Sequence, residues 1–397
     1  MPFSDPIRPA ISGLLRNGIG EVSRLGLGNP DIIPLWFGES DLATPPFIRE
    51  AAKQALDEGR TFYTWAVGLL ELREAITRYM ARWTGAHIGL DRVTVPGSAM
   101  LSIMIALQCV LERGDNVVII TPVWPNIFQA VIAAGGEPRF VPLDPPMETG
   151  QWRLDFDTLR AACDARTKAI FVASPGNPTG WVMPAAQQEA LLAFAREAGL
   201  AILSDEVYGP IMYDRRHAPS FATLARDDDN VFIINSLSKA WAMTGWRIGW
   251  LIHPLRLAGP MATLAAVNNT GATTFAQYGA IAAIDKGDDF IAFMVERCRK
   301  GRAIVCDFVR QHQRVSWAEP EGAFYGFLNI AGVTDSLAFA KYLVTEAKVG
   351  VAPGSAFGPP NGAGTGSFIR ICFAQDPGRL CEALERIAGG IDAYHPR

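Results

Sequence analysis

The chain has 397 residues, of which 49% are apolar and 19% are charged, and its net charge at neutral pH is −4. That length exceeds what one hydrophobic core usually serves, so we expect two packed units. Because the charge is slightly acidic and no block of like charge occurs, the composition argues against a nucleic-acid surface and against a polybasic membrane anchor.

The cysteines, the histidines and the apolar runs bear on whether the protein is secreted, spans a membrane or binds a metal. The six cysteines show no CxxC spacing, and the N-terminal stretch MPFSDPIRPA lacks the charged and apolar regions of a secretion signal. No apolar run approaches the ~18 residues of a membrane span. The five histidines never stand at metal-ligand spacing. We therefore expect a cytoplasmic protein with reduced thiols, no membrane segment and no metal site.

Between about residues 95 and 255, short β-branched runs alternate with helical stretches. Runs that are apolar throughout are typical of strands buried on both faces of a largely parallel sheet. The predicted strands cover 116–122, 169–175, 201–208, 231–239 and 247–253, and the predicted helices between them cover 99–113 and 185–198. This alternation indicates an α/β unit with helices on both faces of its sheet.

After about residue 285 the sequence becomes more charged and helical, and a last helix is predicted at 379–392. We expect this tail, joined by the N-terminal segment, to form a smaller α+β unit. The predicted division is an N-terminal arm with part of the small unit over 1–45, a large unit over 46–285 and a small unit over 286–397.

Polar residues stand at the carboxyl ends of the predicted strands, where open α/β sheets bind ligands. They are Asn177, then Asp205 with Tyr208, then Ser236, Ser238 and Lys239, and the turn PGSAM opens the first long helix. Lys239 follows a buried strand and precedes Arg247, and both features would lower its pKa and leave an amine able to form an imine. The alternative is a lysine that extends from the strand end into solvent.

The neighbours of Lys239 also have two interpretations. Asp205 by itself suits a helix cap or a metal ligand, and PGNPTG around Asn177 suits a simple turn. A buried aspartate can instead keep a pyridine nitrogen protonated, and Asn177 and Tyr208 can donate to a ring oxygen. The predicted phosphate ligands are the helix-opening N–H groups of Ser98, Ala99 and Met100, with the side chains of Ser236, Ser238 and Arg247.

Four segments in this order, ASPGNPTG, SDEVYG, SLSKAWAMTGWRIGW and FIRICFA, resemble the fold-type I pyridoxal-phosphate enzymes. The resemblance is to the class I/II aminotransferases related to aspartate aminotransferase, and it runs from about residue 37 to 374. It implies a three-layer α/β/α large domain with a mostly parallel seven-stranded sheet, plus a smaller α+β domain. It also implies pyridoxal 5'-phosphate as cofactor and the transfer of an amino group from an L-amino acid to a 2-oxo acid.

The resemblance assigns roles to individual residues. Lys239 would hold the cofactor as an internal aldimine and carry the proton, Asp205 would face the pyridine nitrogen, and Asn177 and Tyr208 would face the ring oxygen. The phosphate would meet the six ligands named above. Trp124 would stack on the cofactor ring. The substrate would be bound by Gly38 and Arg370 at its carboxylate, with Trp124 and Asn177 also in contact with it. Tyr63 would reach the phosphate in the site of a second subunit. The last match implies a homodimer with shared sites.

Substrate choice and reaction type stay open at this stage. One branch of the family has a lysine where this chain has Ser98, which puts strict aspartate specificity in doubt. Aromatic residues expected near the pocket, Trp36, Phe37, Trp65, Phe324 and Tyr325, favour aromatic or apolar amino acids, although such residues are more often core. The alternatives are a C–S lyase, an eliminating synthase or an oxidase on the same fold, and a non-catalytic ligand-sensing module.

Overall fold

The computed structural model describes residues 7–14, 18–146, 150–360, 362 and 364–395. Its main sheet has seven strands in the order β2-β8-β7-β6-β5-β3-β4. The strands are β2 (Val93–Gly97), β3 (Asn116–Thr121), β4 (Glu137–Pro142), β5 (Thr167–Ala173), β6 (Ala201–Asp205), β7 (Val231–Ser236) and β8 (Gly249–Ile252). All neighbours are parallel except β8, which is antiparallel to β2 and β7. The predicted fold class, a mostly parallel α/β sheet, is confirmed.

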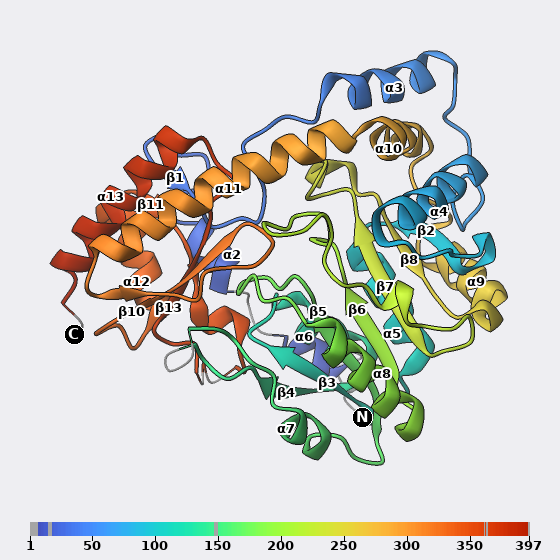
Figure 1. The fold of residues 1–397 in the computed structure, drawn as a ribbon, viewed down its shortest axis with the longest axis horizontal. Helices are drawn as coiled ribbons and strands as arrows, with labels where there is room; N and C mark the ends of the chain where they lie inside the picture. Colours follow the sequence, from blue (N-terminus) through green and yellow to red (C-terminus); the bar gives the residue numbers. More distant parts are fainter. Residues whose placement is uncertain (1–6, 15–17, 147–149, 361, 363, 396–397) are drawn as a thin grey trace, which may run out of the picture.

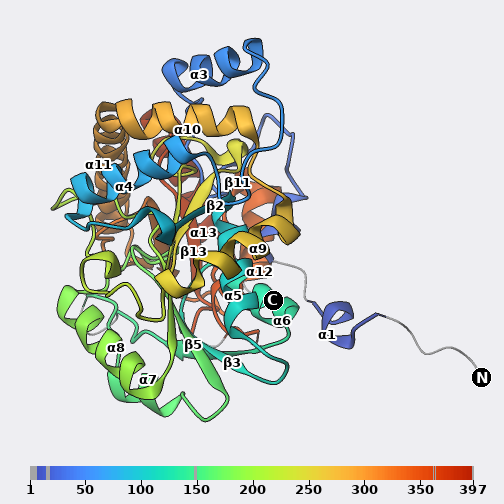
Figure 2. The same cartoon turned by 90° about the vertical axis from the view of Figure 1, so that its right-hand side faces the viewer.

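Successive residues of each central strand enter two different cores. In β3, Val117 and Ile119 belong to the core that α5, α6 and α9 cover, whereas Val118 and Ile120 belong to the core on the opposite face, which includes α8. This period of two explains why the strands are apolar throughout. The helices of this part are α3 (Pro46–Asp57), α4 (Leu70–Thr84), α5 (Ala99–Val110), α6 (Asn126–Ala134), α7 (Phe156–Ala161), α8 (Ala185–Ala198), α9 (Ala258–Asn269) and α10 (Thr274–Lys286). Figure 2 shows α3 lying beside α10 at one end of the molecule.

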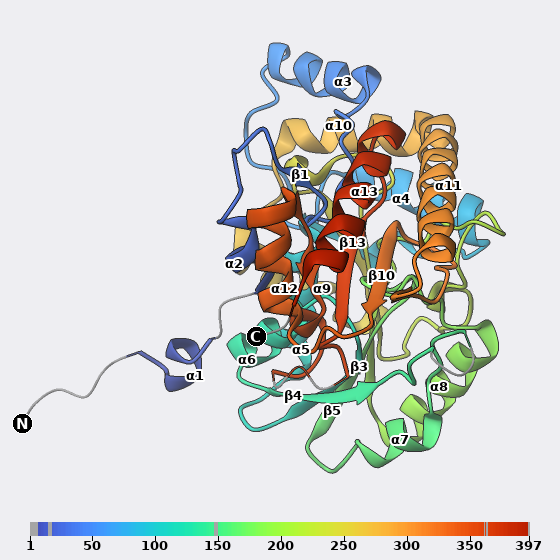
Figure 3. The same ribbon diagram turned by 90° about the vertical axis from the view of Figure 1, so that its left-hand side faces the viewer.

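The C-terminal part builds a second, antiparallel sheet in the order β12-β13-β10-β9. Its strands are β9 (Val315–Ser316), β10 (Tyr325–Ile330), β12 (Ala352–Pro353) and β13 (Phe368–Cys372), and its helices are α11 (Asp288–Gln311), α12 (Ser336–Tyr342) and α13 (Pro377–Ala393). Helices α11 and α13 lie side by side against this sheet (Figures 1 and 3). The N-terminal part contributes α1 (Pro9–Ser12), α2 (Gly18–Ser23) and β1 (Ile33–Pro34), which pairs with β11 (Val349–Gly350).

We propose for the folded chain the same division that the sequence predicts, with boundaries near residues 45 and 285. The pairing of β1 with β11 supports the assignment of the N-terminal arm to the small unit. None of the described helices is both long enough and apolar enough to span a bilayer.

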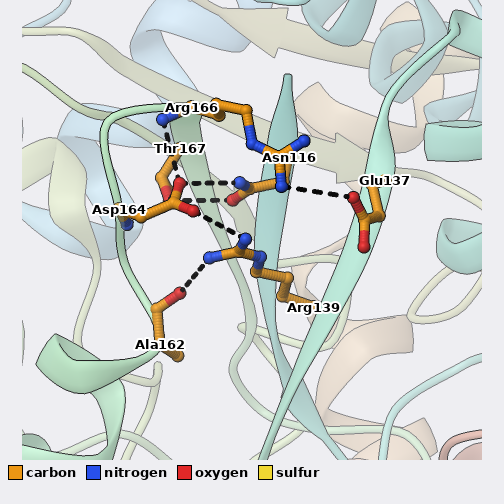
Figure 4. Close-up of polar contacts among 7 residues, drawn as sticks. All are labelled: Asn116, Glu137, Arg139, Ala162, Asp164, Arg166 and Thr167. Atoms are coloured by element: carbon orange, nitrogen blue, oxygen red, sulfur yellow. Dashed lines mark hydrogen bonds and ion pairs between the residues drawn. The ribbon is translucent and has the colours of Figure 1, made fainter. Parts of the chain in front are cut away.

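A cluster of polar side chains lies at the amino ends of β3 and β5 (Figure 4). This is the end of the sheet opposite the carboxyl ends that carry the predicted site residues. The buried Asn116 of β3 donates to Asp164 over 2.9 Å and accepts from Thr167 over 2.8 Å. Arg139 of β4 donates to the same aspartate over 2.6 Å. These bonds hold the pKa of Asp164 well below its usual range, with the bond from Asn116 as the largest cause. The cluster ties β3, β4 and the start of β5 to one another at this end of the sheet.

Candidate active site

A cavity of about 160 Å³ lies at the carboxyl ends of the central strands. The sequence-predicted residues that line it come from α5, the β5, β6 and β7 strand ends, and the loops after β3 and β7. They are Ala99, Met100, Trp124, Asn177, Asp205, Tyr208, Ser236, Ser238, Lys239 and Arg247. The structure thus brings together ten of the predicted residues in one place. Ser98, Gly38 and Arg370 are directly bonded, covalently or by a hydrogen bond, to residues of this set. Tyr63 is not among the lining residues, and its side chain is exposed.

Lys239 extends from the end of β7 toward the N-terminal segment. Its Nζ donates to the Gly38 carbonyl oxygen over 2.6 Å and lies 5.9 Å from the centre of the Tyr208 ring. Burial, as the largest cause, and the nearby Arg370 guanidinium together lower the pKa of Lys239 to about 8. At pH 8, roughly half of such amines are neutral, so this lysine can act as a nucleophile and as a base near neutral pH.

Asp205 ends β6 with its carboxylate in the cavity. One oxygen accepts from the backbone N–H of Val207 over 3.2 Å. Burial raises the pKa of Asp205 to about 6, and the Val207 bond and the Lys239 charge only partly oppose it. A buried carboxylate in this position is stabilised by a cationic ring nitrogen, which is the partner that the sequence predicts.

Arg370 lies on β13, 2% exposed, and reaches the cavity from the small sheet. Its Nη1 donates to Asn177 Oδ1 over 3.1 Å and its Nη2 donates to the Trp36 carbonyl oxygen. Its Nε has no hydrogen-bond partner in the described structure. Its charge also faces no carboxylate there, because none of the ion pairs of the described residues includes Arg370. An anionic ligand held by the guanidinium would satisfy both groups.

One end of the cavity lies where α5 begins. Ser98 caps the helix and accepts from the Leu101 N–H over 3.3 Å. A Cβ on Gly249 would lie 2.8 Å from the Ala99 nitrogen, so glycine is what allows β8 to approach the helix start. Ser236 accepts from the Ser238 N–H over 3.0 Å, which fixes the turn before Lys239. Arg247, on the same segment, is exposed.

This donor set suits pyridoxal phosphate. A helix N-terminus, two serines and an arginine match a phosphate, Asp205 matches a ring nitrogen, and Lys239 matches an aldehyde carbon. Among the residues that the structure describes, no three His, Cys, Asp or Glu side chains gather in a way that could hold a metal ion.

The sequence did not predict every residue around the cavity. Ile103, Ala173, Val207 and Thr244 also line it. Thr244 could have been found, because it stands in the same stretch as Lys239 and Arg247. Its hydroxyl donates to Glu39 over 2.9 Å, which ties the Lys239 loop to the N-terminal segment.

The aromatic residues expected near the pocket are distributed differently. The side chain of Trp36 is buried in the core, where a Cβ on Gly350 would lie 1.9 Å from its ring. Phe324 is also buried, whereas Phe37 and Trp65 are exposed. None of the five lines the cavity, although Tyr325 hydrogen-bonds to Tyr208 beside it. Closeness in sequence to the site motifs was therefore not enough to predict which aromatic side chains line this cavity.

Comparison with known proteins gives a uniform picture. A family model described as aminotransferase class I and II matches residues 30–387. The chain is 36% identical to an aspartate aminotransferase of Pyrococcus abyssi, over 91% of this chain and 92% of the relative. It is 35% identical to aromatic-amino-acid aminotransferase 2 of Thermococcus litoralis, with the same coverage. The crystal structure of the aspartate aminotransferase from Rhizobium meliloti superposes with a TM-score of 0.88 at 31% identity, covering 98% of this chain and 99% of that one.

Proposed function

Because this chain belongs to the class I and II aminotransferases, which are pyridoxal-phosphate-dependent enzymes, we propose that amino transfer takes place in the cavity at Lys239. An L-amino acid would give its amino group in one half-reaction, and a 2-oxo acid would accept it in the next. The observation that carries this assignment is the meeting of Lys239, Asp205 and an anion-binding helix start in one cavity.

The positions of the side chains around the cavity support the proposed cofactor contacts. Ser98, Ala99, Met100, Ser236, Ser238 and Arg247 would hold the phosphate, Trp124 would cover the ring, and Asn177 and Tyr208 would contact the ring oxygen. Asp205 would hold a proton on the ring nitrogen. When bound, pyridoxal phosphate supplies an aldehyde carbon and a ring that withdraws electrons. Arg370, with Gly38, Trp124 and Asn177 nearby, would fix the substrate through its carboxylate.

Lys239 would then transfer the α-proton of the amino acid substrate. The Gly38 carbonyl, which accepts from the free Lys239 amine, and the adjacent Tyr208 ring would keep this amine at the cavity. With a pKa of about 8, it can take the α-proton as a base and give it back as an acid. Arg370 would hold the substrate carboxylate in a fixed orientation during the proton transfer, because its planar guanidinium can donate two parallel hydrogen bonds to a carboxylate.

We propose aromatic or apolar amino acids as the preferred donors. The support is the apolar wall of Met100, Ile103 and Trp124, and the presence of Ser98 where one branch of the family has a lysine. Among the described lining residues, the only cations are Lys239 and Arg247, and both have other proposed tasks.

With purified holoenzyme and 2-oxoglutarate, phenylalanine is expected to give a kcat/KM at least tenfold above that of aspartate, about 1.4 kcal/mol of discrimination. Each mole of phenylpyruvate should appear with one mole of glutamate. A preference for aspartate would contradict the substrate class. Ammonia released without any acceptor would instead favour the lyase or oxidase alternative.

We further propose a homodimer in which Tyr63 serves the partner's site. Phe62, Tyr63, Trp65 and Val267 are 82%, 91%, 79% and 78% exposed, which is unusual for such side chains. The segment is nevertheless held firmly, because Thr274 donates to the Phe62 carbonyl over 2.6 Å and Gln277 donates to Thr64 over 3.2 Å. A second copy of the chain would cover this apolar surface.

Val267→Arg should convert the dimer into monomer and weaken pyridoxal-phosphate binding together, about tenfold or more in each equilibrium. Sedimentation and cofactor titration at matched protein concentrations would measure both. Phe293→Arg, at an exposed position of α11, is the control and should change neither. A monomeric Val267→Arg with normal cofactor affinity would contradict the shared site.

The proposed location is the cytoplasm, and the proposed partners besides the second subunit are small amino and oxo acids. The support is that all six cysteines are unpaired, which is typical of a reducing compartment.

A further inference from the structure

Tyr325 begins β10 and lies where several parts of the site meet. Its side chain is fully buried, and its hydroxyl oxygen is 2.5 Å from that of Tyr208. A Cβ on Gly38 would come within 2.0 Å of the same hydroxyl, so Tyr325 rests directly on the Gly38 backbone. The guanidinium carbon of Arg370 lies 4.7 Å from the centre of the Tyr325 ring. One side chain therefore contacts the predicted carboxylate site and the predicted ring-oxygen donor.

We infer that Tyr325 is a positioning residue, which donates its O–H to Tyr208, turns the Tyr208 O–H into the cavity and makes that donation depend on the charge at Arg370. This inference rests on the proposed assignment of the cavity as the reaction site. No covalent step is involved, since only the direction of one hydrogen bond is set.

The direction of the bond follows from how many protons the two phenols have and where they can go. Each hydroxyl carries one proton, and if Tyr208 gave its own to Tyr325, none would remain for the cavity. Among the described residues, Tyr208 is the hydrogen-bond partner found for the Tyr325 hydroxyl, and the Gly38 backbone fills the space beside it. Donation from Tyr325 uses its proton and leaves that of Tyr208 free.

The charges around the pair favour the same direction. The titratable groups that face Tyr325 are Arg370 and Cys372 on β13, and Asp205 and Tyr208 at the end of β6. Burial raises the pKa of Tyr325, but the Arg370 guanidinium opposes that rise. Burial raises the pKa of Tyr208 well above its ordinary value, Tyr325 and Asp205 add to the rise, and Arg370 opposes it. Arg370 acts on both phenols, but its guanidinium carbon lies 4.7 Å from the centre of the Tyr325 ring, so Tyr325 is the better donor.

This arrangement links the two ends of the site. A substrate carboxylate on Arg370 would neutralise the cation next to the Tyr325 ring, and Tyr325 would become a weaker donor. Tyr208 would respond, and Lys239 lies 5.9 Å from the Tyr208 ring centre. Filling the carboxylate site would therefore change the proton affinity of the Lys239-bound cofactor through two tyrosines as well as directly through space.

The test is a pH titration of the absorbance of the holoenzyme. Tyr325→Phe keeps the ring over Arg370 and removes the hydroxyl alone. The apparent pKa of the Lys239-bound cofactor is expected to rise by roughly half to one pH unit, because Tyr208 loses its fixed orientation. Saturating 3-phenylpropanoate, a carboxylate without an amino group, should shift this pKa less in the variant than in the wild type. Because the ring remains, kcat should fall by roughly three- to tenfold with little change in KM.

Two further variants separate this role from general packing. If Tyr325 acts through Tyr208, the double variant Tyr208→Phe/Tyr325→Phe should titrate like Tyr208→Phe alone. Tyr213→Phe is the matched control, since Tyr213 also lies under an arginine, Arg302 at 4.2 Å, and donates to the Ala323 carbonyl over 2.5 Å, outside the cavity. Its titration should equal that of the wild type.

Additive effects in the double variant, or a Tyr325→Phe enzyme that titrates as the wild type does, would overturn the inference while leaving the proposed function intact. A wild-type protein that forms no Lys239-dependent absorbance band with pyridoxal phosphate would overturn both.

Discussion

Lys239→Ala is expected to lower kcat for amino transfer by about 10⁴-fold or more while the protein stays folded. The reason for the loss is that one amine would serve as the cofactor's attachment point and as the acid and base. The reason for the intact fold is that the side chain makes a single described hydrogen bond, to the Gly38 carbonyl over 2.6 Å. Stopped-flow assays of each half-reaction and a thermal melt of the same sample would measure both effects.

Lys239→Arg is the matched control for charge and length. It keeps a cation near Gly38 but provides no neutral amine at ordinary pH, so it should be about as inactive as the alanine variant. In the wild type, borohydride should fix pyridoxal phosphate on Lys239. The capture rate by the apoprotein should reach half of its maximum near pH 8 and level off about one pH unit higher, because that pKa sets the fraction of free amine. Near-normal turnover by either variant would remove Lys239 from the mechanism.

Much of this site could be predicted from sequence because its parts are local. Ser236, Ser238, Lys239 and Arg247 lie in one continuous segment that starts at the last residue of β7, so their proximity follows from chain connectivity. Asp205 ends β6 and Asn177 lies in the loop that follows β5, and the carboxyl ends of parallel neighbouring strands meet at one edge of the sheet.

The contacts of the small sheet with the site could not be predicted from the sequence, because they join distant parts of the chain. Arg370 reaches Asn177 across 193 positions, and no periodicity indicates that pairing. Tyr325 was expected only as a pocket aromatic, and its bond to Tyr208 appears only when β10 is placed beside the end of β6. Local sequence patterns therefore do not predict from which side Arg370 and Tyr325 enter the site, or which residues they contact there.

Two strands of the main sheet also escaped prediction, for separate reasons. β4 contains Pro138 and Pro142 and is half exposed, as suits the edge strand that it is. β2 contains Pro96 and is the other edge strand, where it pairs with the antiparallel β8. Neither shows the continuous apolar run that identified the central strands.

Arg370→Gln is expected to reduce kcat/KM for an amino acid donor by about 10³-fold, mostly through KM, because a buried charge-assisted pair with the substrate carboxylate would be lost. The neutral side chain can still donate toward Asn177 or the Trp36 carbonyl, the two groups that Arg370 contacts. The fold should therefore survive. Steady-state kinetics with phenylalanine, beside a thermal melt, would measure the two effects separately.

A donor without a carboxylate makes this prediction specific. With 2-phenylethylamine, which offers nothing for Arg370 to hold, Arg370→Gln and the wild type should react at similar low rates. Arg302→Gln is the control for loss of a cation over an aromatic ring, because Arg302 lies over Tyr213 and donates to the Pro320 carbonyl away from the cavity. If phenylalanine and 2-phenylethylamine lost rate equally in Arg370→Gln, the arginine would shape the site without binding the carboxylate. Only a selective loss for the carboxylate donor supports Arg370 as its ligand.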